Sequence, residues 1–303
     1  MVLERSDLTV IRLLEKRGLF WRGEELSDAG IERDDFLEGV RRLVDSGLIR
    51  SFHLTLMVPP LLGGNWVLAA LWARADEPRR SVSELVARIG FVNEIFINSG
   101  LPVNIGPNIA LLFYSRDLEG ETRFIKNLSG LSGVEVFRVQ EYSFPVSLPL
   151  SREERTFLRF LADNPGIDLD GVARAFGQSA GWVQAKLDRL FWSDKNPAGV
   201  FRIMPSLDWT RCVNFAHIHF LVETGHRPEV LSKLIAAGGM ELVLGGRQIA
   251  GRFVGVEADV WGIAEMMERG AFLNRLSGVR VIGVVYHQEL LIQDEWVRRV
   301  LGT

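Results

Sequence analysis

The feature of this 303-residue sequence that most limits its possible folds is an internal duplication. The segment GIERDDFLEGVRRL (Gly30 to Leu43) is matched by GQSAGWVQAKLDRL (Gly177 to Leu190), and both ends of the match are separated by 147 residues. A second pair, FIKNLSGLSGVEVF and AFLNRLSGVRVIGV, shows a helix end, then Ser-Gly-Val, then a strand. One folding unit is therefore written twice, and each copy must bury its own apolar face.

Each copy begins with a segment that has the apolar spacing of three short helices. In the first copy we expect helices at 7–17, 24–29 and 33–45, with Gly30 as the turn before the third, followed by a wing strand at 48–58. The second copy repeats this order with a first helix that carries Leu158 and Leu161, helices at 170–176 and 180–191, and a wing strand at 200–204. The pattern predicts two winged helix-turn-helix heads.

After each head the pattern changes to the order β-α-β-β-α-β, which is typical of a ferredoxin-like domain. In the first copy the expected strands are 66–74, 91–98, 109–114 and 134–140, and the expected helices are 82–89 and 117–128. In the second copy the strands are 213–223, 240–244, 248–256 and 279–286, and the helices are 228–237 and 258–269. A short helix in the tail would bury Trp296 and Val300.

These signals predict an α+β fold made of two tandem repeats, each a winged helix-turn-helix head followed by a ferredoxin-like βαββαβ domain. The Pro-Pro and Gly-Gly pairs near residue 60 and the proline-punctuated segment SFPVSLPL mark boundaries between the parts. We predict heads at 1–60 and 151–208, sensor domains at 64–142 and 211–290, a linker at 143–150 and a tail at 291–303.

Composition narrows the class of protein. The hydrophobic fraction of 47% with a charged fraction of 24% is that of a globular protein, and no apolar run reaches the ~18 residues that a membrane span needs. The N-terminus MVLERSDL lacks a secretory signal, so we expect a cytoplasmic protein that does not bind membranes. Cys212, the single cysteine, excludes an intramolecular disulfide. A net charge of −3 requires any DNA contact to be local.

The sequence resembles the Lrp/AsnC family of transcriptional regulators. The resemblance is carried by GIERDDFLEGVRRLVDSGLIR in the first head and by SRDLEGETRFIKNLSGLSGV (Ser115 to Val134), which is similar to the family's second sensor helix and the strand after it. The family implies double-stranded DNA bound by the third helix of each head, dimerisation through the sheets, and a small-molecule effector between sensor domains. In a tandem chain, the two copies would form this dimer internally, and a further homo-oligomer stays open.

The two heads differ at the start of the third helix, the part that faces base edges in a helix-turn-helix protein. The first head places Glu32, Asp34, Asp35 and Glu38 there, and carboxylates are repelled by phosphates. The second head has polar and basic groups instead, so we predict that it makes the main DNA contact. The predicted DNA-binding residues are Gln178, Ser179, Gln184, Lys186 and Arg189, with Arg33, Arg41 and Arg42 from the first head.

By analogy with the family, an effector is expected in a cleft formed by residues 99–108 and 245–250. The predicted effector-binding residues are Asn104, Asn108, Arg247 and Gln248. His217 and His219 lie two apart on a strand and therefore share a face, a spacing that suits a metal or an acidic ligand. Because the sequence shows no third histidine or aspartate beside them, we predict that they line the face where the sensor domains meet.

Two alternatives to a DNA-binding regulator stay open. Siroheme decarboxylases are similar to Lrp/AsnC proteins, occur as paired or fused copies and need no DNA, but their His- and Arg-containing motif is not matched in SGLPVNIGPN or LGGRQIAG. The other alternative is an effector-binding or interaction protein whose heads no longer bind DNA. No motif indicates a catalytic residue, a metal site or a cofactor, so we expect none and favour a non-enzymatic protein.

Overall fold

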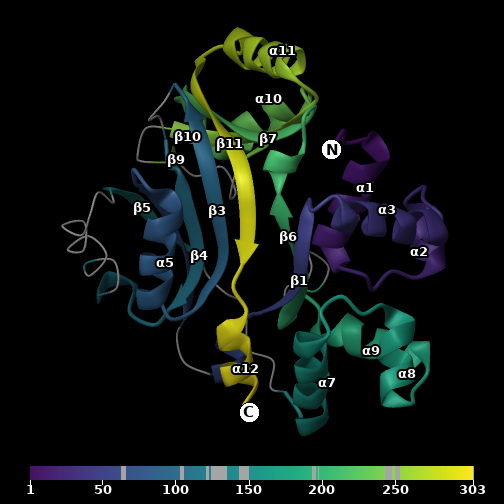
Figure 1. Ribbon diagram of the computed structural model, residues 1–303. Helices are drawn as coiled ribbons and strands as arrows, with labels where there is room; N and C mark the ends of the chain where they lie inside the picture. Colours follow the sequence, from purple (N-terminus) through teal and green to yellow (C-terminus); the bar gives the residue numbers. More distant parts are fainter. Residues whose placement is uncertain are drawn as a thin grey trace.

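The computed structural model contains two copies of a head followed by a sensor sheet (Figure 1). It describes residues 1–62, 66–102, 106–120, 123, 135–142, 150–192, 196, 198–242, 248–249 and 253–302. The tandem α+β architecture predicted from the duplication is therefore confirmed.

The first head consists of α1 (Arg5–Arg17), α2 (Gly23–Asp28), α3 (Arg33–Asp45) and the wing strand β1 (Ile49–Leu56). At the start of α1 the Asp7 carboxylate accepts a hydrogen bond from the Glu4 N–H at 2.8 Å. At its end Gly18 adopts a positive φ of 59°, which a residue with a side chain rarely adopts. The apolar faces of α1 and α3 are buried against each other.

The second head consists of α7 (Arg152–Asp163), α8 (Leu169–Phe176), α9 (Ala180–Leu190) and the wing strand β6 (Phe201–Asp208). Each of these helices begins with a side-chain cap, from Ser151, Asp168 and Ser179 respectively. Each cap satisfies a backbone N–H that the helix itself leaves without a partner.

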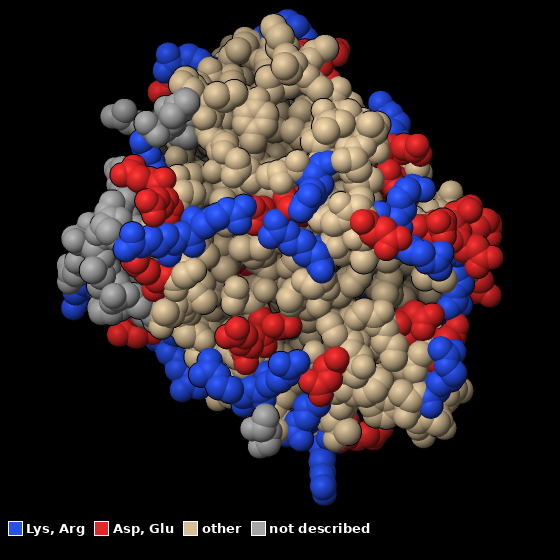
Figure 2. All heavy atoms as spheres, in the orientation of Figure 1, with Lys and Arg blue, Asp and Glu red and all other residues tan. Residues whose placement is uncertain are grey.

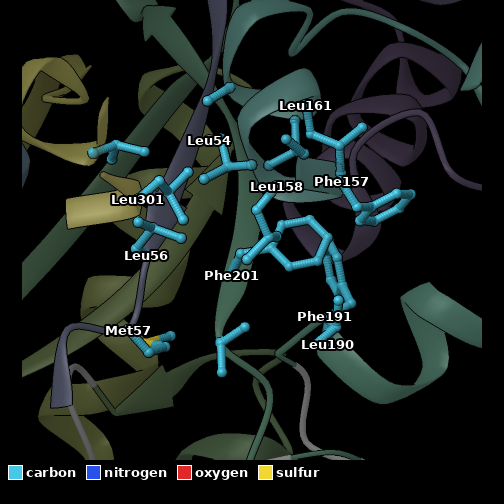
Figure 3. Close-up of a cluster of buried hydrophobic side chains, with 14 of the residues drawn as sticks. Leu54, Leu56, Met57, Phe157, Leu158, Leu161, Leu190, Phe191, Phe201 and Leu301 are labelled. Carbon is cyan, nitrogen blue, oxygen red and sulfur yellow. The ribbon is translucent and has the colours of Figure 1, made fainter. Parts of the chain in front are cut away.

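The heads are joined through their wings. Strands β1 and β6 pair antiparallel, from Ile49 opposite Leu207 to Leu56 opposite Phe201. The paired wings cover one continuous apolar core with the second head and the C-terminal helix α12 (Glu295–Leu301). Figure 3 shows this core with its labelled members Leu54, Leu56, Met57, Phe157, Leu158, Leu161, Leu190, Phe191, Phe201 and Leu301. The expected tail helix thus exists, and it buries Trp296 and Val300.

The remaining elements form two units, and the name sensor domain is kept for them as a label taken from the family resemblance. The first contains β2 (Val67–Arg74), α5 (Pro78–Arg88), β3 (Val92–Leu101), β4 (Ile109–Ser115) and β5 (Glu135–Tyr142) after a short helix α4 (Pro59–Leu62). The second contains β7 (Ala216–Thr224), α10 (Pro228–Ala236), β8 (Glu241–Leu242), β9 (Gln248–Ile249), β10 (Phe253–Val260), α11 (Ile263–Arg275) and β11 (Val279–Ile292), after the 3-10 turn η2 (Trp209–Arg211).

The two sensor domains share one sheet, with strand order β5-β2-β4-β3-β11-β7-β10-β8. They meet where β3 and β11 pair antiparallel, from Leu101 opposite Val284 to Glu94 opposite Ile292. Alternate residues of each strand point to opposite faces. Side chains on one face, for example Ile95 of β3 and Phe220 of β7, pack beneath the helices. The opposite face carries side chains of both domains, such as Phe96 and His219, around one cavity and is called the shared face.

One predicted helix boundary is wrong. Residues 258–260, expected to begin a helix, continue strand β10, and α11 starts at Ile263. The reason is that Ala258 and Val260 continue the alternation of Val254 and Val256 and bury their side chains in the core beneath the helices. Most of the predicted helix 117–128 and residues 143–149 of the predicted linker lie outside the described residues. No helix in the described ranges is long and apolar enough to cross a membrane.

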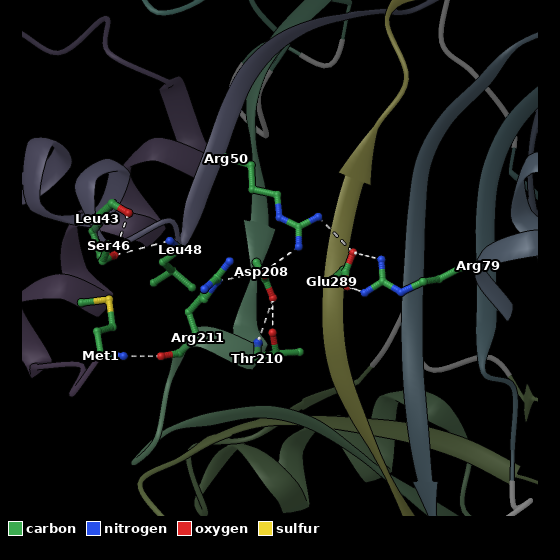
Figure 4. A network of polar contacts seen from close by, with 10 residues as sticks. All are labelled: Met1, Leu43, Ser46, Leu48, Arg50, Arg79, Asp208, Thr210, Arg211 and Glu289. Atoms are coloured by element: carbon green, nitrogen blue, oxygen red, sulfur yellow. Dashed lines mark hydrogen bonds and ion pairs between the residues drawn. The ribbon is translucent and has the colours of Figure 1, made fainter.

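An ionic network with two buried carboxylates connects the wings with both sensor domains (Figure 4). Arg50 of β1 contacts Asp208 of β6 at 2.5 Å and Glu289 of β11 at 3.2 Å, and Arg79 of α5 also contacts Glu289. Burial alone would raise the pKa of Asp208, but hydrogen bonds from Thr210 and Arg50 lower it. The Asp208 and Glu289 side chains are 3% and 0% exposed, so their partners are needed to compensate buried charge.

Candidate ligand-binding site

A cavity of about 180 Å³ lies on the shared face of the sheet, lined by side chains from both sensor domains. The first domain supplies Ala70, Trp72, Glu94, Phe96, Asn98, Pro107, Ala110, Leu111 and Leu112. The second supplies His217, His219, Leu221, Glu257, Val285 and His287. The predicted position of His217 and His219, on the face where the sensor domains meet, agrees with this geometry. The wall formed by the first domain is mainly apolar. The wall formed by the second domain carries three imidazoles and is called the histidine wall.

The strand register brings the histidines together. Strand β7 pairs with β10 so that His219 lies opposite Glu257 and His217 opposite Asp259. On its other side β7 pairs with β11, with Ile218 opposite Tyr286, which places the next residue, His287, beside His217. The ring centroids of His287 lie 4.8 Å from His217 and 4.1 Å from His219. The His287 Nε2 atom is 3.1 Å from Nε2 of His219.

The three histidines have different charge preferences. Burial would lower the pKa of His217, but its Nδ1 is 2.8 Å from an Asp259 oxygen, and this hydrogen bond with the charges of Glu257 and Asp259 raises the pKa. Burial lowers the pKa of His219 and His287 well below the ordinary value, and the neighbouring imidazoles lower it further. Near neutral pH, His219 and His287 are therefore neutral and available as ligands or hydrogen-bond partners.

The opposite wall offers oxygen atoms. Burial raises the pKa of Glu94, and this carboxyl group forms no salt bridge within the described part of the chain. The Asn98 side chain is 6% exposed, and its Oδ1 atom has no hydrogen-bond partner among the described residues. An unsatisfied buried acceptor is unfavourable by ~1–3 kcal/mol. The cavity therefore contains acceptors on one wall and imidazoles on the other, between apolar surfaces.

The cavity is connected to the first head through Asp259. One oxygen of this carboxylate contacts His217, and the other forms an ion pair with Arg12 of α1. One turn further along α1, burial raises the pKa of Glu15 to about 7, and the negative charges of Glu257 and Asp259 add to this effect. The first helix of the chain thus contributes ionisable groups that interact with the histidine wall.

The predicted effector residues lie elsewhere or outside the described part. The Asn108 side chain accepts a hydrogen bond from the Ala75 N–H at 3.0 Å and donates to the Ala75 carbonyl at 2.6 Å, so it connects two backbone segments. Gln248 lies in the short strand β9. Asn104 and Arg247 lie outside the described residues. The cavity is built from strand faces, and the alternation of His217 and His219 was the sequence signal that pointed toward it.

In the second head, the predicted DNA-contacting residues are mostly engaged within the head. The Ser179 hydroxyl accepts the Trp182 N–H at 3.2 Å as the cap of α9, while Gln178 before it is exposed. Gln184 is 7% exposed and donates to Asp188. The remaining two are cations that form ion pairs with α7: Lys186 with Glu153 at 3.1 Å, and Arg189 with Glu154 at 2.6 Å.

In the first head, all three predicted cations also form ion pairs. Arg33, at the start of α3, contacts Asp168 at 3.2 Å and Asp170 at 2.7 Å, both in the second head. Arg41 pairs with Glu38, and Arg42 pairs with Asp7. Figure 2 shows acidic and basic side chains side by side over this head. The face in view carries no continuous basic stripe over the described residues of the two heads.

No family model matches the sequence, and no curated protein matches it. Among solved structures, the siroheme decarboxylase NirDL aligns with 98% of this chain and 96% of its own, at 14% identity and a TM-score of 0.46. A transcriptional regulator from Neisseria meningitidis in complex with L-Met aligns with 50% of this chain and 99% of its own, at 20% identity and a TM-score of 0.29. An AsnC family regulator from Agrobacterium tumefaciens covers 50% of this chain and 98% of its own, at 14% identity and a TM-score of 0.29. These neighbours belong to the two protein classes that the sequence resembles.

Proposed function

We propose that this chain is an effector-binding protein with the architecture of an Lrp/AsnC-type regulator, and that the cavity between its sensor domains holds a small polar molecule. The observation that carries the proposal is the convergence of polar groups from both domains on one largely apolar cavity. Such a combination is the usual composition of a small-molecule site.

The size and chemistry of the cavity define the ligand class. A cavity of about 150 Å³ accommodates benzene, so about 180 Å³ suits a molecule of amino-acid size. N–H groups of the ligand would satisfy Asn98 Oδ1 and the Glu94 carboxyl, while the histidine wall would receive a carboxylate. A tetrapyrrole is larger than this space and would bind only if the two walls separated.

A ligand screen tests the proposal. Thermal unfolding would be followed with each of the twenty amino acids and with siroheme, and every compound that raises the midpoint would be measured by calorimetry. We expect one-to-one binding of an amino acid or a similar zwitterion, weakened at least tenfold by Glu94→Gln. Glu268→Gln on the exposed face of α11 is the matched control and should leave the affinity unchanged. Siroheme binding with a shifted Soret band would favour the decarboxylase alternative instead, and binding equal in both variants would place the ligand elsewhere.

A second candidate function, DNA contact by the second head, is favoured by one observation. Helix α9 has no carboxylate in its first turn, and Gln178 and Ser179 are exposed there, whereas α3 begins with Asp34 and Asp35. The pairing of the wing strands and the ion pairs of Arg33 with Asp168 and Asp170 favour the alternative in which the heads bind each other.

Fluorescence anisotropy with genomic DNA fragments at low and high salt separates these two roles of the heads. If the second head binds DNA, Lys186→Ala with Arg189→Ala should weaken binding and reduce its salt dependence, because two phosphate contacts are lost. The same double change at Arg80 and Arg280, two exposed arginines outside both heads, is the matched control and should leave DNA binding unchanged. Absence of binding at low salt would leave the heads as interaction modules.

A further inference from the structure

We infer that His217, His219 and His287 form a binding site for a first-row divalent metal ion such as Zn²⁺, with Glu257 as the fourth ligand. The three imidazoles and their neighbouring carboxylate face the cavity described above, so the inference rests on the proposed ligand-binding function and adds a metal to it. Imidazole with one carboxylate is a ligand set that suits zinc, copper, nickel and iron.

The ligands are held by paired backbone. His217 and His219 come from β7, His287 from β11 on one side and Glu257 from β10 on the other, and all three strands are hydrogen-bonded neighbours. A site built on adjacent strands of a sheet keeps its side chains at nearly fixed separations. The cluster therefore does not depend on a loop to assemble.

One pair of imidazole nitrogens already has the separation found in a tetrahedral site. One nitrogen from each histidine can be chosen so that all lie within 4.8 Å of one another. Nitrogen atoms bound at the usual Zn–N length would be about 3.3 Å apart. Nε2 of His287 and Nε2 of His219 already lie 3.1 Å apart. One Glu257 oxygen lies 3.6 Å from Nε2 of His217 and the other 3.9 Å from Nε2 of His219, so this carboxylate borders the cluster and is the nearest candidate for the fourth ligand among the described residues.

The surroundings of His217 also fit a ligand. Its Nδ1 atom is hydrogen-bonded to Asp259, which leaves Nε2 directed toward Glu257 and the cluster. Metal-binding histidines usually have this second partner, which fixes the ring orientation. Asp259 is fixed in turn by its ion pair with Arg12. The cluster thus has ligands and an orienting carboxylate.

Metal titration of the full-length protein tests the inference. After removal of metals with a chelator, Zn²⁺ would be titrated by calorimetry and Co²⁺ by its visible absorption, which is intense in tetrahedral sites. We expect one ion per chain, with affinity reduced at least tenfold by His287→Gln. His226→Gln is the control, because His226 lies outside the cavity and contacts the Ser277 carbonyl. Glu257→Gln provides a second, less buried variant in case His287→Gln does not fold.

The outcomes separate this inference from the proposed function. Absence of stoichiometric binding, or an affinity unaffected by both cavity variants, would overturn the metal site. If Zn²⁺ did not bind but an amino acid did, the metal inference alone would fail and the proposed function would stand. If Zn²⁺ bound at the cluster and no organic compound did so with or without it, the metal site would stand and the proposed small-molecule effector would fail.

Discussion

The two copies of the repeat have the same fold but opposite charges where they meet. Within the described residues, seven ion pairs join the copies, and in each the arginine belongs to the first copy and the carboxylate to the second. The pairs are Arg12 with Asp259, Arg17 with Asp188, Arg33 with Asp168 and with Asp170, Arg50 with Asp208 and with Glu289, and Arg79 with Glu289. The His53 imidazole adds a hydrogen bond to Asp294 with the same division of partners.

This difference in charge between the two contact surfaces determines which copies can associate. A contact between two identical copies would place each basic patch against another basic patch, because a symmetric interface repeats the same surface. Unlike charges favour the pairing of the first copy with the second and disfavour either copy with itself. The charge division therefore favours contact between a first copy and a second copy over contact between two like copies.

The largest expected effect comes from the centre of this contact. We predict that Arg50→Met lowers the free energy of unfolding by about 2–4 kcal/mol, because it leaves the buried carboxylates of Asp208 and Glu289 undercompensated. Urea unfolding at pH 7 measures the loss. Arg80→Met, which breaks only exposed pairs with Glu77 and Glu84, should lower stability by less than about 1 kcal/mol. An equal effect of both variants would contradict a central role for Arg50.

The stabilising contribution of Asp208 depends on pH because its pKa is lowered in the folded state. The contribution is present above the ordinary pKa of the carboxyl group and disappears as the pH falls through the lowered value.

A smaller effect is expected at Glu15, which breaks the rule by placing an acid of the first copy near Glu257 and Asp259 of the second. Burial raises its pKa to about 7, so the folded protein retains a proton that the unfolded chain releases above its ordinary pKa of 4.5. Stability therefore falls as the pH rises from that value past 7. We predict that Glu15→Gln is more stable than the parent by about 1–3 kcal/mol at pH 9 and nearly equal at pH 5, in urea unfolding. A gain that does not change with pH would assign the effect to packing.

The smallest effect is expected at the edge of the contact. Arg33 contacts Asp168 and Asp170, but all three side chains are about a third exposed, so water screens their charges. We predict that Arg33→Ala lowers the free energy of unfolding by less than about 1 kcal/mol and that 0.5 M salt removes the difference. A salt-independent loss above about 2 kcal/mol would show that the pair between the heads matters as much as the network around Arg50.

The repeat and most elements were predictable because they depend on local patterns. The spacing that matches Gly30 to Leu43 with Gly177 to Leu190 predicts the second head, and the structure has it. Segment 258–260 was wrongly predicted as helix because the residues that follow it have helical spacing. In the structure it ends strand β10, whose alternate side chains enter the core. Local pattern alone does not determine which of two neighbouring periods applies at a boundary.

The candidate site was only half predictable, because its parts come from distant strands. His217 and His219 identify a face from their spacing, but His287 is 68 residues from His219 and joins them through the register of β7 with β11. Glu257 and Asp259 arrive through the register of β7 with β10. The pairing of β1 with β6 was also not predicted, since nothing in either wing strand specifies the other as its partner.

The shared carboxylate of Asp259 has a thermodynamic consequence for the whole chain. Because Arg12 of the first head and His217 of the cavity contact the same group, occupancy of the cavity that displaces His217 changes the environment of α1. Linkage is reciprocal. If a macromolecule displaced Arg12 on binding and so changed the affinity of the cavity for its ligand, the ligand would change the affinity of the chain for that macromolecule by the same factor. Under the proposed function, Asp259 would then couple ligand binding in the cavity to the contacts of the first head.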